Sequence, residues 1–301
     1  MTRPDLLQTL ERAEQVICCA EERRPDVQDQ FARESSRPAQ VPEGLLQVGV
    51  DLGTAYLVLV VLDQHQQPIA GEYQFAQVAR DGLVVDFIGA VDRLTAMKRR
   101  VEGRLGRELT HASSGYPPSV PKAEVRATAN VVEAAGFHCT GLVDEPSAAN
   151  ALIGLQNGVI VDVGGGTTGL AILREGEVVY TADEPTGGTH FSLVIAGAHD
   201  ISLEAAETMK LDPSQQARLF PVIRPVMEKV ASIVNRHVEI YKSRDGHAVD
   251  QLVLVGGTAQ FPGIAGVLEE YTGIPTQVPD RPLFVTPLGI AMHDITSQSS
   301  G

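Results

Sequence analysis

The chain is poor in cysteine, and it contains no long hydrophobic run. Cys18, Cys19 and Cys139 are odd in number and two of them are adjacent, so they predict no disulfide framework and fit a reducing cytoplasm. No segment has the apolar length of a membrane span, and the polar N-terminus differs from a signal peptide. The histidines lack the H-x-x-x-H spacing of a zinc site. We therefore expect a cytoplasmic protein with no membrane partner.

Basic residues are also in short supply. The chain has 24 lysines and arginines against 38 aspartates and glutamates, which leaves a net charge of −14. Such a charge argues against a general partner among nucleic acids or anionic membranes. The 301 residues, 43% of them hydrophobic, suffice for two domains or one large two-lobed domain. No G-x-x-x-x-G-K-[ST] segment occurs, which excludes a P-loop.

The first 44 residues differ from the rest of the chain. Leu6, Leu10, Ala13 and Ile17 recur at helical spacing, which predicts a short amphipathic helix. Residues 21–44 are polar and contain three prolines, as in a linker. Two interpretations stay open. The helix docks on its own domain or frays, or it docks into a partner.

The segment VIVDVGGGTTGLAIL, residues 159–173, contains glycines with the G-x-G-x-x-G spacing of a dinucleotide fingerprint. Asp183 and Glu184 even follow at about the distance of that motif's ribose ligand. The fingerprint requires a helix after the glycines. Here two short β-rich runs flank Glu175-Gly176, which predicts a hairpin. The dinucleotide interpretation therefore fails on its structural context.

A glycine loop at the tip of a hairpin can bind an anion instead. Without Cβ atoms, successive backbone N–H groups can close around phosphate oxygens, and threonine hydroxyls add donors. Asp162 would repel a bare phosphate, so a divalent cation or its water shell is expected between them. An earlier segment repeats the pattern, because Asp51 and Gly53 precede Asp162 and Gly164 by 111 residues. We therefore expect two similar lobes that hold the phosphates of a nucleotide with Mg²⁺.

Five segments in this order resemble the motifs of the actin-like ATPase superfamily. They are the first phosphate motif VGVDLGTA, the first connecting motif LVDEPSAANAL, the second phosphate motif VIVDVGGGTTG, the adenosine motif LVLVGGTAQFPG and the second connecting motif VTPLGIAM. The resemblance implies an α/β fold of the actin-like ATPase type, which is a duplicated ribonuclease H-like fold with two lobes around a nucleotide cleft. It covers residues 45–292.

Within that superfamily the chain resembles the EutJ family of ethanolamine-utilisation proteins, which are DnaK-like and chaperone-like members of bacterial microcompartment operons. DEPSAAN, DVGGGTTG, TGGTHFS and ISLEAAETMK carry this resemblance. We expect a helix and linker over residues 1–44. Lobe I is then expected over residues 45–153 and 285–301, and lobe II over residues 154–284.

The resemblance implies roles for individual residues. Asp51 and Asp162 would hold Mg²⁺ through its waters, although both also suit a turn after a strand. Glu145 would position the attacking water, or it merely favours the start of a helix. The resemblance also implies phosphate-binding residues, which are Gly53, Thr54, Gly164, Gly165, Gly166, Thr167 and Thr168.

Further positions are expected near the nucleotide. Gly187 and Gly188 either approach it or permit a turn. Gly256 and Gly257 would contact adenosine, or they serve helix packing. Glu207 and Lys210 match positions near adenosine in filament-forming relatives, with solvated charges as the alternative.

Two departures from the chaperone pattern affect catalysis. Gly169 stands where that pattern has an aspartate, and residues 64–112 offer no clear counterpart of its catalytic lysine. Since the sequence ends soon after the second connecting motif, we also expect no β-sandwich peptide-binding domain. We expect a slow Mg²⁺-ATPase, with ATP or ADP as cofactor, that assists a microcompartment enzyme or shell protein. A non-hydrolysing adaptor that targets cargo through its N-terminal helix is the alternative, and a small-molecule kinase ranks lower.

Overall fold

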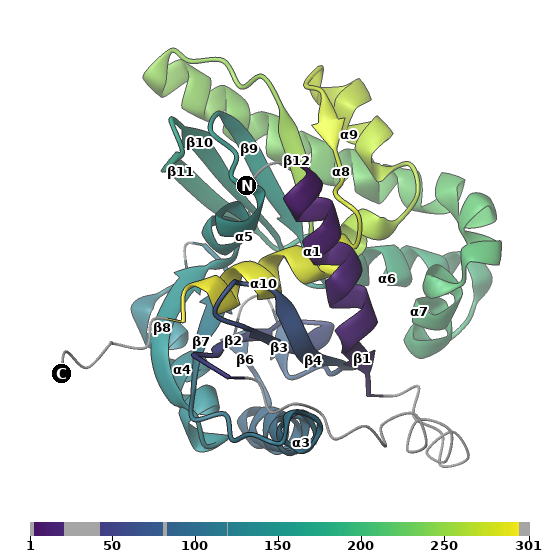
Figure 1. The fold of residues 1–301 in the computed structure, drawn as a ribbon. Coiled ribbons are helices and arrows are strands. Elements are labelled where there is room, and N and C mark those ends of the chain that lie inside the picture. Colours follow the sequence, from purple (N-terminus) through teal and green to yellow (C-terminus); the bar gives the residue numbers. More distant parts are fainter. Residues whose placement is uncertain (1–2, 21–42, 81–82, 119, 295–301) are drawn as a thin grey trace. The chain divides into compact units, whose positions relative to one another are not determined.

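The computed structural model describes residues 3–20, 43–80, 83–118 and 120–294. The chain divides into two compact units (Figure 1). Unit 1 comprises residues 1–116, 120–143 and 287–301, and unit 2 comprises residues 117–119 and 144–286. Apart from residues 117–119, the change from unit 1 to unit 2 falls at residue 144, ten residues before the expected boundary, so the helix that follows Asp144 lies with the second unit.

Unit 1 is built on a six-stranded sheet in the order β1-β4-β3-β2-β7-β8. Valine and leucine side chains make β3 buried after its first residue, and β2 is buried except at Gln47 and Asp51. The strands are β1 (Ile17–Cys19), β2 (Gln47–Leu52), β3 (Tyr56–Leu62), β4 (Pro68–Phe75), β7 (His111–Tyr116) and β8 (His138–Asp144). A separate two-stranded ribbon pairs β5 (Ala79–Arg80) with β6 (Leu83–Val84).

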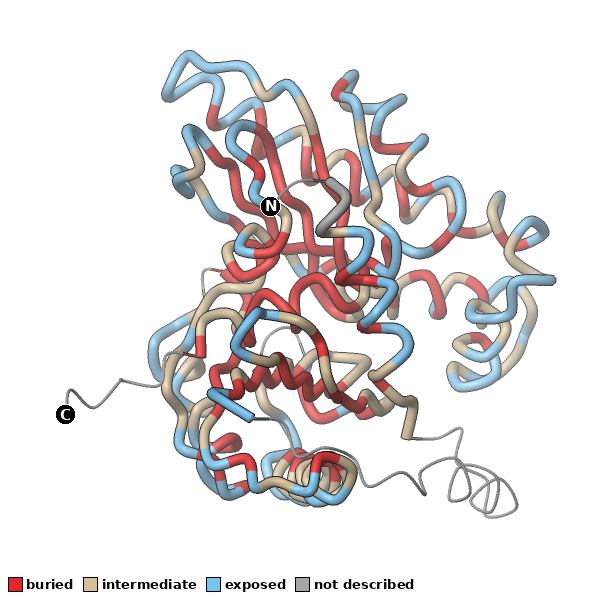
Figure 2. Tube along the Cα trace, in the orientation of Figure 1, coloured by how far each residue is buried: buried red, intermediate tan, exposed pale blue. Residues whose placement is uncertain are grey.

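The helices of unit 1 follow from their sequence signals. The helix α3 (Phe87–Leu105) begins at Asp86, whose side chain accepts a hydrogen bond from the Gly89 N–H, and ends at Gly106 in the left-handed conformation. The second helix, α4 (Lys122–Ala134), has Val131 and Val132 fully buried. Both helices contribute to one apolar core with β2, β3 and β4. Figure 2 shows how burial follows the strands.

The N-terminal helix docks on unit 1. Leu10 and Ala13 of α1 (Arg3–Val16) are fully buried, and Arg12 Nε donates a hydrogen bond to the Pro68 carbonyl oxygen at 2.8 Å. The chain continues as β1, which pairs in parallel with β4 from Ile17 opposite Gly71. The apolar face is thus occupied by the chain's own sheet edge, in agreement with the docked interpretation. The expected linker, residues 21–44, lies almost wholly outside the described residues.

Docking predicts unequal effects of two leucine substitutions in this helix. Leu10 is fully buried whereas Leu7 is 44% exposed. Leu10→Ala should lower the free energy of unfolding of unit 1 by about 2–4 kcal/mol, because it leaves a cavity. Leu7→Ala, the matched control, should change it by less than about 0.5 kcal/mol. Urea unfolding of the full chain measures both, and equal effects would contradict a docked helix.

Unit 2 is built on a five-stranded sheet in the order β11-β10-β9-β12-β13. Its central strands are continuous apolar runs, as expected for strands covered on both faces. The strands are β9 (Gly158–Val163), β10 (Thr168–Arg174), β11 (Glu177–Glu184), β12 (Leu252–Val255) and β13 (Thr276–Gln277). As predicted, β10 and β11 form an antiparallel hairpin through Glu175-Gly176, so no helix follows the glycine loop.

The helices of unit 2 enclose one apolar core that includes Phe191, Met227 and Leu254. The longest of them, α8, contacts β10, β11 and α9 (Figure 1). The helices are α5 (Glu145–Ile153), α6 (Gly188–His199), α7 (Leu203–Leu211), α8 (Pro213–Asp245) and α9 (Ile264–Thr272). Two 3₁₀ turns, η1 (Gly257–Gln260) and η2 (Pro282–Phe284), flank the end of β12, and α10 (Val285–Met292) begins in unit 2 and continues in unit 1.

The two sheets repeat one topology. The strands β2 and β9 each pair antiparallel with the next strand in the chain, which pairs antiparallel with a third. In unit 1 β2 also pairs in parallel with β7, and in unit 2 β9 pairs in parallel with β12. Asp51 is the penultimate residue of β2, and Asp162 is the penultimate residue of β9. The repeat detected in the sequence is therefore a structural duplication.

Candidate functional site

Asp162 lies at the centre of the candidate site in unit 2. It sits at the end of β9, between Gly169 of β10 and Val255 of β12. The Thr286 hydroxyl, at the start of α10, donates a hydrogen bond of 2.5 Å to Asp162 Oδ2. The carboxylate is 7% exposed. A turn-forming aspartate would lie at the surface, so burial argues against that simple role.

Burial of Asp162 has an electrostatic consequence. It raises the pKa of this carboxyl to about 6, and the hydrogen bond from Thr286 opposes the shift. A buried carboxylate without a cation nearby is costly because it has lost most of its hydration. A divalent cation or its water shell beside Asp162 would favour the ionised form. The donor chemistry of the site therefore fits Mg²⁺.

The glycine loop, residues 164–168, turns back tightly on itself. Gly164 N–H donates to the Thr167 carbonyl at 3.0 Å. The carbonyl oxygens of Gly164 and Gly165 accept hydrogen bonds from the first N–H groups of α6 at 2.9 and 2.8 Å. The Thr168 hydroxyl donates to the carbonyl of Thr186 at 2.6 Å. These bonds hold the loop against the start of α6.

The other side of the loop carries backbone donors. Within the described ranges, the N–H groups of Gly165, Gly166 and Thr167 have no protein acceptor, although Gly166 and Thr167 are buried. Buried backbone donors are almost always bonded, to water or a ligand when not to protein. Consecutive backbone donors in a turn can bind an anion together. This is the strongest geometric sign of a phosphate site in unit 2.

Gly187 and Gly188 are required by close approach within the protein. A Cβ atom on Gly187 would lie 2.7 Å from the Gly164 carbonyl oxygen. One on Gly188 would lie 2.4 Å from Oγ1 of Thr258, a hydroxyl that itself donates to the Gly164 carbonyl at 2.8 Å. The pair thus packs α6 on the glycine loop. Contact of either residue with a nucleotide stays a prediction.

Glu207 and Lys210 form a largely buried ion pair on α7. Their side chains are 17% and 12% exposed, and Lys210 Nζ lies 2.7 Å from Glu207 Oε2. Nζ also donates to the Gly188 carbonyl at 3.2 Å, and the Ser192 hydroxyl donates to Glu207 Oε2 at 2.5 Å. Burial lowers the pKa of Lys210, and Glu207 opposes that shift. The alternative of solvated charges is therefore wrong.

Gly256 and Gly257 follow β12 and begin the turn η1. Gly256 has a φ of +88°, and an added Cβ would lie 2.3 Å from Asp162 Oδ1. Gly257 lies beside Leu283, with an added Cβ 3.3 Å from its Cδ1 atom. The backbone at Gly256 thus passes directly over the buried carboxylate. Adenosine contact by this pair stays a prediction.

Glu145 is the first residue of α5. The N-cap is Asp144, whose Oδ1 accepts from Ser147 N–H at 3.1 Å, so capping does not require Glu145. Pro146 follows in the first turn, as expected for a helix start. A negative charge in the first turn interacts favourably with the helix dipole. Glu145 can therefore stabilise the start of α5 and also have the predicted catalytic role.

The corresponding residues of unit 1 form a shorter turn. Asp51 is half-buried in β2 and pairs with Val58 of β3. Gly53 and Thr54 lie in the connection between the two strands. A Cβ on Gly53 would approach the Tyr56 carbonyl oxygen to 2.8 Å, so the tight turn requires glycine. The proposed phosphate contacts of this turn stay predictions.

Three polar residues of the site were not predicted from the sequence. Thr286 bonds Asp162, Thr258 bonds the glycine loop, and Ser192 bonds Glu207. All three lie inside sequence motifs that carry the family resemblance, but no role was predicted for any of them. The hydrogen-bond partners of these three hydroxyl groups lie 15 to 124 residues away in the chain, so no local spacing could predict them.

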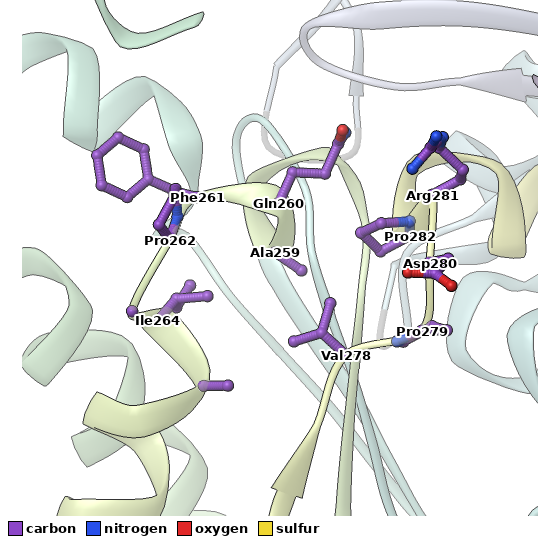
Figure 3. Close-up of a pocket in the computed structure, with 12 residues that line it drawn as sticks. Ala259, Gln260, Phe261, Pro262, Ile264, Val278, Pro279, Asp280, Arg281 and Pro282 are labelled. Atoms are coloured by element: carbon purple, nitrogen blue, oxygen red, sulfur yellow. The ribbon is translucent and has the colours of Figure 1, made fainter. Parts of the chain in front are cut away.

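A separate pocket of about 390 Å³ lies beside η1 (Figure 3). Phe261, Ile264 and Val278 supply apolar lining, and Asp280 and Arg281 lie on the opposite side. Its lining residues include none of the predicted site residues. The candidate site is thus defined by backbone donors and buried polar side chains, and not by this pocket.

The described residues also bear on how a cation could be held. No group of three histidine, cysteine, aspartate or glutamate side chains could hold a metal there. Mg²⁺ commonly keeps several of its waters when only one or two carboxylates are near it. No helix in the same ranges combines the length and the apolar character needed to cross a bilayer.

Comparison with known proteins assigns the chain to a family. The ethanolamine utilization protein EutJ of Escherichia coli (strain K12) is 41% identical over 250 residues, which cover 83% of this chain and 86% of that protein. The chain belongs to the EutJ family. The crystal structure of EutJ from Carboxydothermus hydrogenoformans agrees, with a TM-score of 0.81 and 41% identity over 96% of this chain and 99% of that one.

More distant matches extend the EutJ assignment to the fold. Family models described as type IV pilus assembly protein PilM and as MreB/Mbl protein match residues 147–286 and 70–199. MreB5 of Spiroplasma citri, solved bound to AMPPNP, has a TM-score of 0.65 and 19% identity over 83% of this chain and 96% of that one. The fold of this EutJ-family chain is that of the actin-like ATPases, as predicted.

A chaperone also matches the EutJ-family chain. The HscA homologue of Chromobacterium violaceum is 27% identical over 241 residues, which cover 65% of this chain but only 39% of that protein. The chain therefore corresponds to less than half of that chaperone.

Proposed function

We propose that this protein binds Mg²⁺–ATP, hydrolyses it slowly, and uses the nucleotide state to control a partner in ethanolamine utilisation. The observation that carries the proposal is the row of three backbone donors at Gly165, Gly166 and Thr167, beside the buried carboxylate of Asp162. An anion and a cation are needed together to satisfy these two groups. A nucleotide polyphosphate with its metal supplies both.

Each residue of the site has a proposed task. The loop N–H groups bind phosphate oxygens, and the hydroxyls of Thr167 and Thr168 belong to the same loop. Asp162 holds a water of the cation, which when bound neutralises charge on the phosphates. Glu145 orients the attacking water.

The nucleoside part is proposed to lie near α7. Lys210 holds Glu207 beside the first residues of α6, so the pair has a fixed position before any ligand arrives. Gly256 and Gly257 bring the backbone of η1 to the same region, since Thr258 contacts Gly188. Asp51, Gly53 and Thr54 are proposed to bind phosphates through the equivalent turn of unit 1.

The relatives support the biological setting. EutJ proteins are named for ethanolamine utilization, and the matching HscA homologue is named as a chaperone. We therefore propose that the partner is an enzyme or a shell protein of the microcompartment. A solved relative of the fold, the PilM–PilN complex, has a bound protein partner.

Titration of the purified full chain with ATP tests the proposal. We expect micromolar binding that Mg²⁺ strengthens, with turnover well below about 1 s⁻¹, which is the low end of typical enzymes. Isothermal titration calorimetry and phosphate release measure the two quantities. Absence of binding would reject the proposal.

Binding without turnover would favour the adaptor function instead. The adaptor function is favoured by Gly169, which has no side chain where the chaperone pattern has an aspartate. In that case cargo recognition by α1 would require the helix to leave unit 1, because Leu10 and Ala13 are buried there. Localisation of a chain that lacks residues 1–20 distinguishes the adaptor from the ATPase. Localisation should be lost if α1 targets the protein, and it should be unchanged if α1 only docks on unit 1.

A further inference from the structure

We propose that Asp183 is an additional positioning residue of the nucleotide site, which supplies from β11 a carboxylate that β10 cannot provide at Gly169. The inference rests on the proposed function and adds a residue to that same site. Asp183 was considered from the sequence only as a ribose ligand of a dinucleotide fold, an interpretation that the β10–β11 hairpin excludes.

Strand register places this residue in line with Asp162. Gly169 of β10 is opposite Asp162 on one side and opposite Asp183 on the other. Directly opposed residues of antiparallel strands present their side chains on the same face of the sheet. Two strand spacings separate the two aspartates, so their Cα atoms are about 9–10 Å apart. Carboxylates at this separation suit a shared water shell better than direct binding of one ion.

The side chain of Asp183 lies over Gly169. A Cβ atom on Gly169 would be 3.4 Å from Asp183 Oδ1 and 3.2 Å from Pro118 Cδ. It would also be 3.5 Å from Cγ of Pro146, the residue that follows Glu145 in α5. The Asp183 carboxylate therefore lies in van der Waals contact with the position that a Cβ atom at residue 169 would take. The first turn of α5 lies against the same position, through Pro146.

The end of β11 is held firmly, so the carboxylate has a defined position. Glu184, the next residue, forms an ion pair with Arg236 of α8. His237 Nε2 lies 3.1 Å from Glu184 Oε1, and His237 Nδ1 lies 2.7 Å from the Tyr180 hydroxyl. These contacts fix β11 to α8 on both sides of Asp183. A residue that orients water must be held in this way, because a shift of about 1 Å can cost two orders of magnitude in rate.

The proposed role is to accept a hydrogen bond from a water that belongs to the bound nucleotide and its cation. Asp183 then acts together with Asp162 in ordering these waters, while the phosphate oxygens are bound by the loop N–H groups. Removal of the negative charge of Asp183 should therefore reduce the nucleotide affinity that is gained from Mg²⁺. The affinity for the metal-free nucleotide should stay almost unchanged.

Calorimetric titration of the full chain with AMPPNP, in Mg²⁺ and in EDTA, tests this role. In Asp183→Asn we expect the affinity gained from Mg²⁺ to fall at least tenfold, with the affinity in EDTA within about twofold of wild type. The value in EDTA also shows that the variant is folded. The double variant Gly169→Asp/Asp183→Gly, which returns the carboxylate to β10, should recover most of the gain.

Glu177→Gln is the matched control. It removes the same charge from an exposed position at the other end of β11, and it should behave as wild type. An unchanged Mg²⁺ effect in Asp183→Asn would overturn the inference and leave ATP binding intact. An equal loss in Glu177→Gln would also overturn it, since the effect would then be long-range charge. A wild-type chain that binds no nucleotide would instead reject the proposed function, and this inference with it.

Discussion

Asp162→Asn should stabilise unit 2 by about 3 kcal/mol at neutral pH and abolish the effect of Mg²⁺ on nucleotide binding. The native pKa of Asp162 is about 6, against 3.8 for the free side chain. Each unit of pKa difference corresponds to about 1.4 kcal/mol. The buried charge of Asp162 therefore lowers the free energy of unfolding, whereas a neutral amide of the same shape does not. Asparagine can still accept the hydrogen bond from Thr286.

The pH dependence gives this prediction a sign. Between about pH 4 and pH 6 the native state of the wild type binds more protons at Asp162 than the unfolded state, so its stability falls as the pH rises. Above pH 6 Asp162 is ionised in both states, so the loss of stability from its buried charge is complete. Asp162→Asn lacks this decline, so the two proteins should be similar near pH 4 and differ most above pH 6.

Urea unfolding from pH 4 to pH 8, in EDTA and without nucleotide, measures the difference. Asp294→Asn is the contrasting control in unit 1. Asp294 Oδ2 accepts from Val48 N–H at 2.8 Å and lies 2.7 Å from His111 Nδ1, so loss of its charge should destabilise by about 1–3 kcal/mol. Parallel stability curves for wild type and Asp162→Asn would show that Asp162 is not the source of the pH dependence.

Gly256→Ala should be the most damaging single-methyl change in the site. The new Cβ would lie 2.3 Å from Asp162 Oδ1 and 2.6 Å from the Val163 carbonyl oxygen. The φ of +88° adds strain for any residue with a side chain. Because backbone on one side and a buried carboxylate on the other leave little room to relax, we expect a loss of about 3 kcal/mol or more. Nucleotide affinity should fall at least tenfold, since Asp162 must move.

Gly197→Ala is the matched control for Gly256→Ala. Gly197 lies inside α6, and an added Cβ would meet nothing within 4 Å. Alanine should stabilise a helix there by about 0.5–1 kcal/mol. Thermal unfolding and AMPPNP titration of both variants give the comparison. Similar stabilities would mean that the backbone at Gly256 moves easily, and would weaken the case for a rigid site.

The hairpin after Gly169 was predictable because its signal is local. Alternating apolar residues and the Glu175-Gly176 turn specify two short strands. This local pattern excluded the dinucleotide-binding fold that the glycine spacing suggested. The duplication was also predictable, since Asp51 and Asp162 end equivalent strands. Family motifs supplied the fold, which the relatives confirm.

Other features depended on distant partners. Glu207 and Lys210 gave no sign of burial, because two charges three residues apart look the same on an exposed helix. Thr286 reaches Asp162 across 124 positions of sequence, so no local spacing could reveal the bond. The docked state of α1 was likewise undecided, since an amphipathic face fits either its own sheet or a partner.

The sequence by itself determined the class of fold, the two equivalent turns and the residue types that can bind phosphate and metal. These are properties of local pattern and of spacing along one chain. Tertiary structure alone decided which donors face outward from the glycine loop, how deeply Asp162 is buried, and that Asp183 lies over Gly169. Burial and strand register arise only when distant segments pack together, and they set the electrostatics of this site.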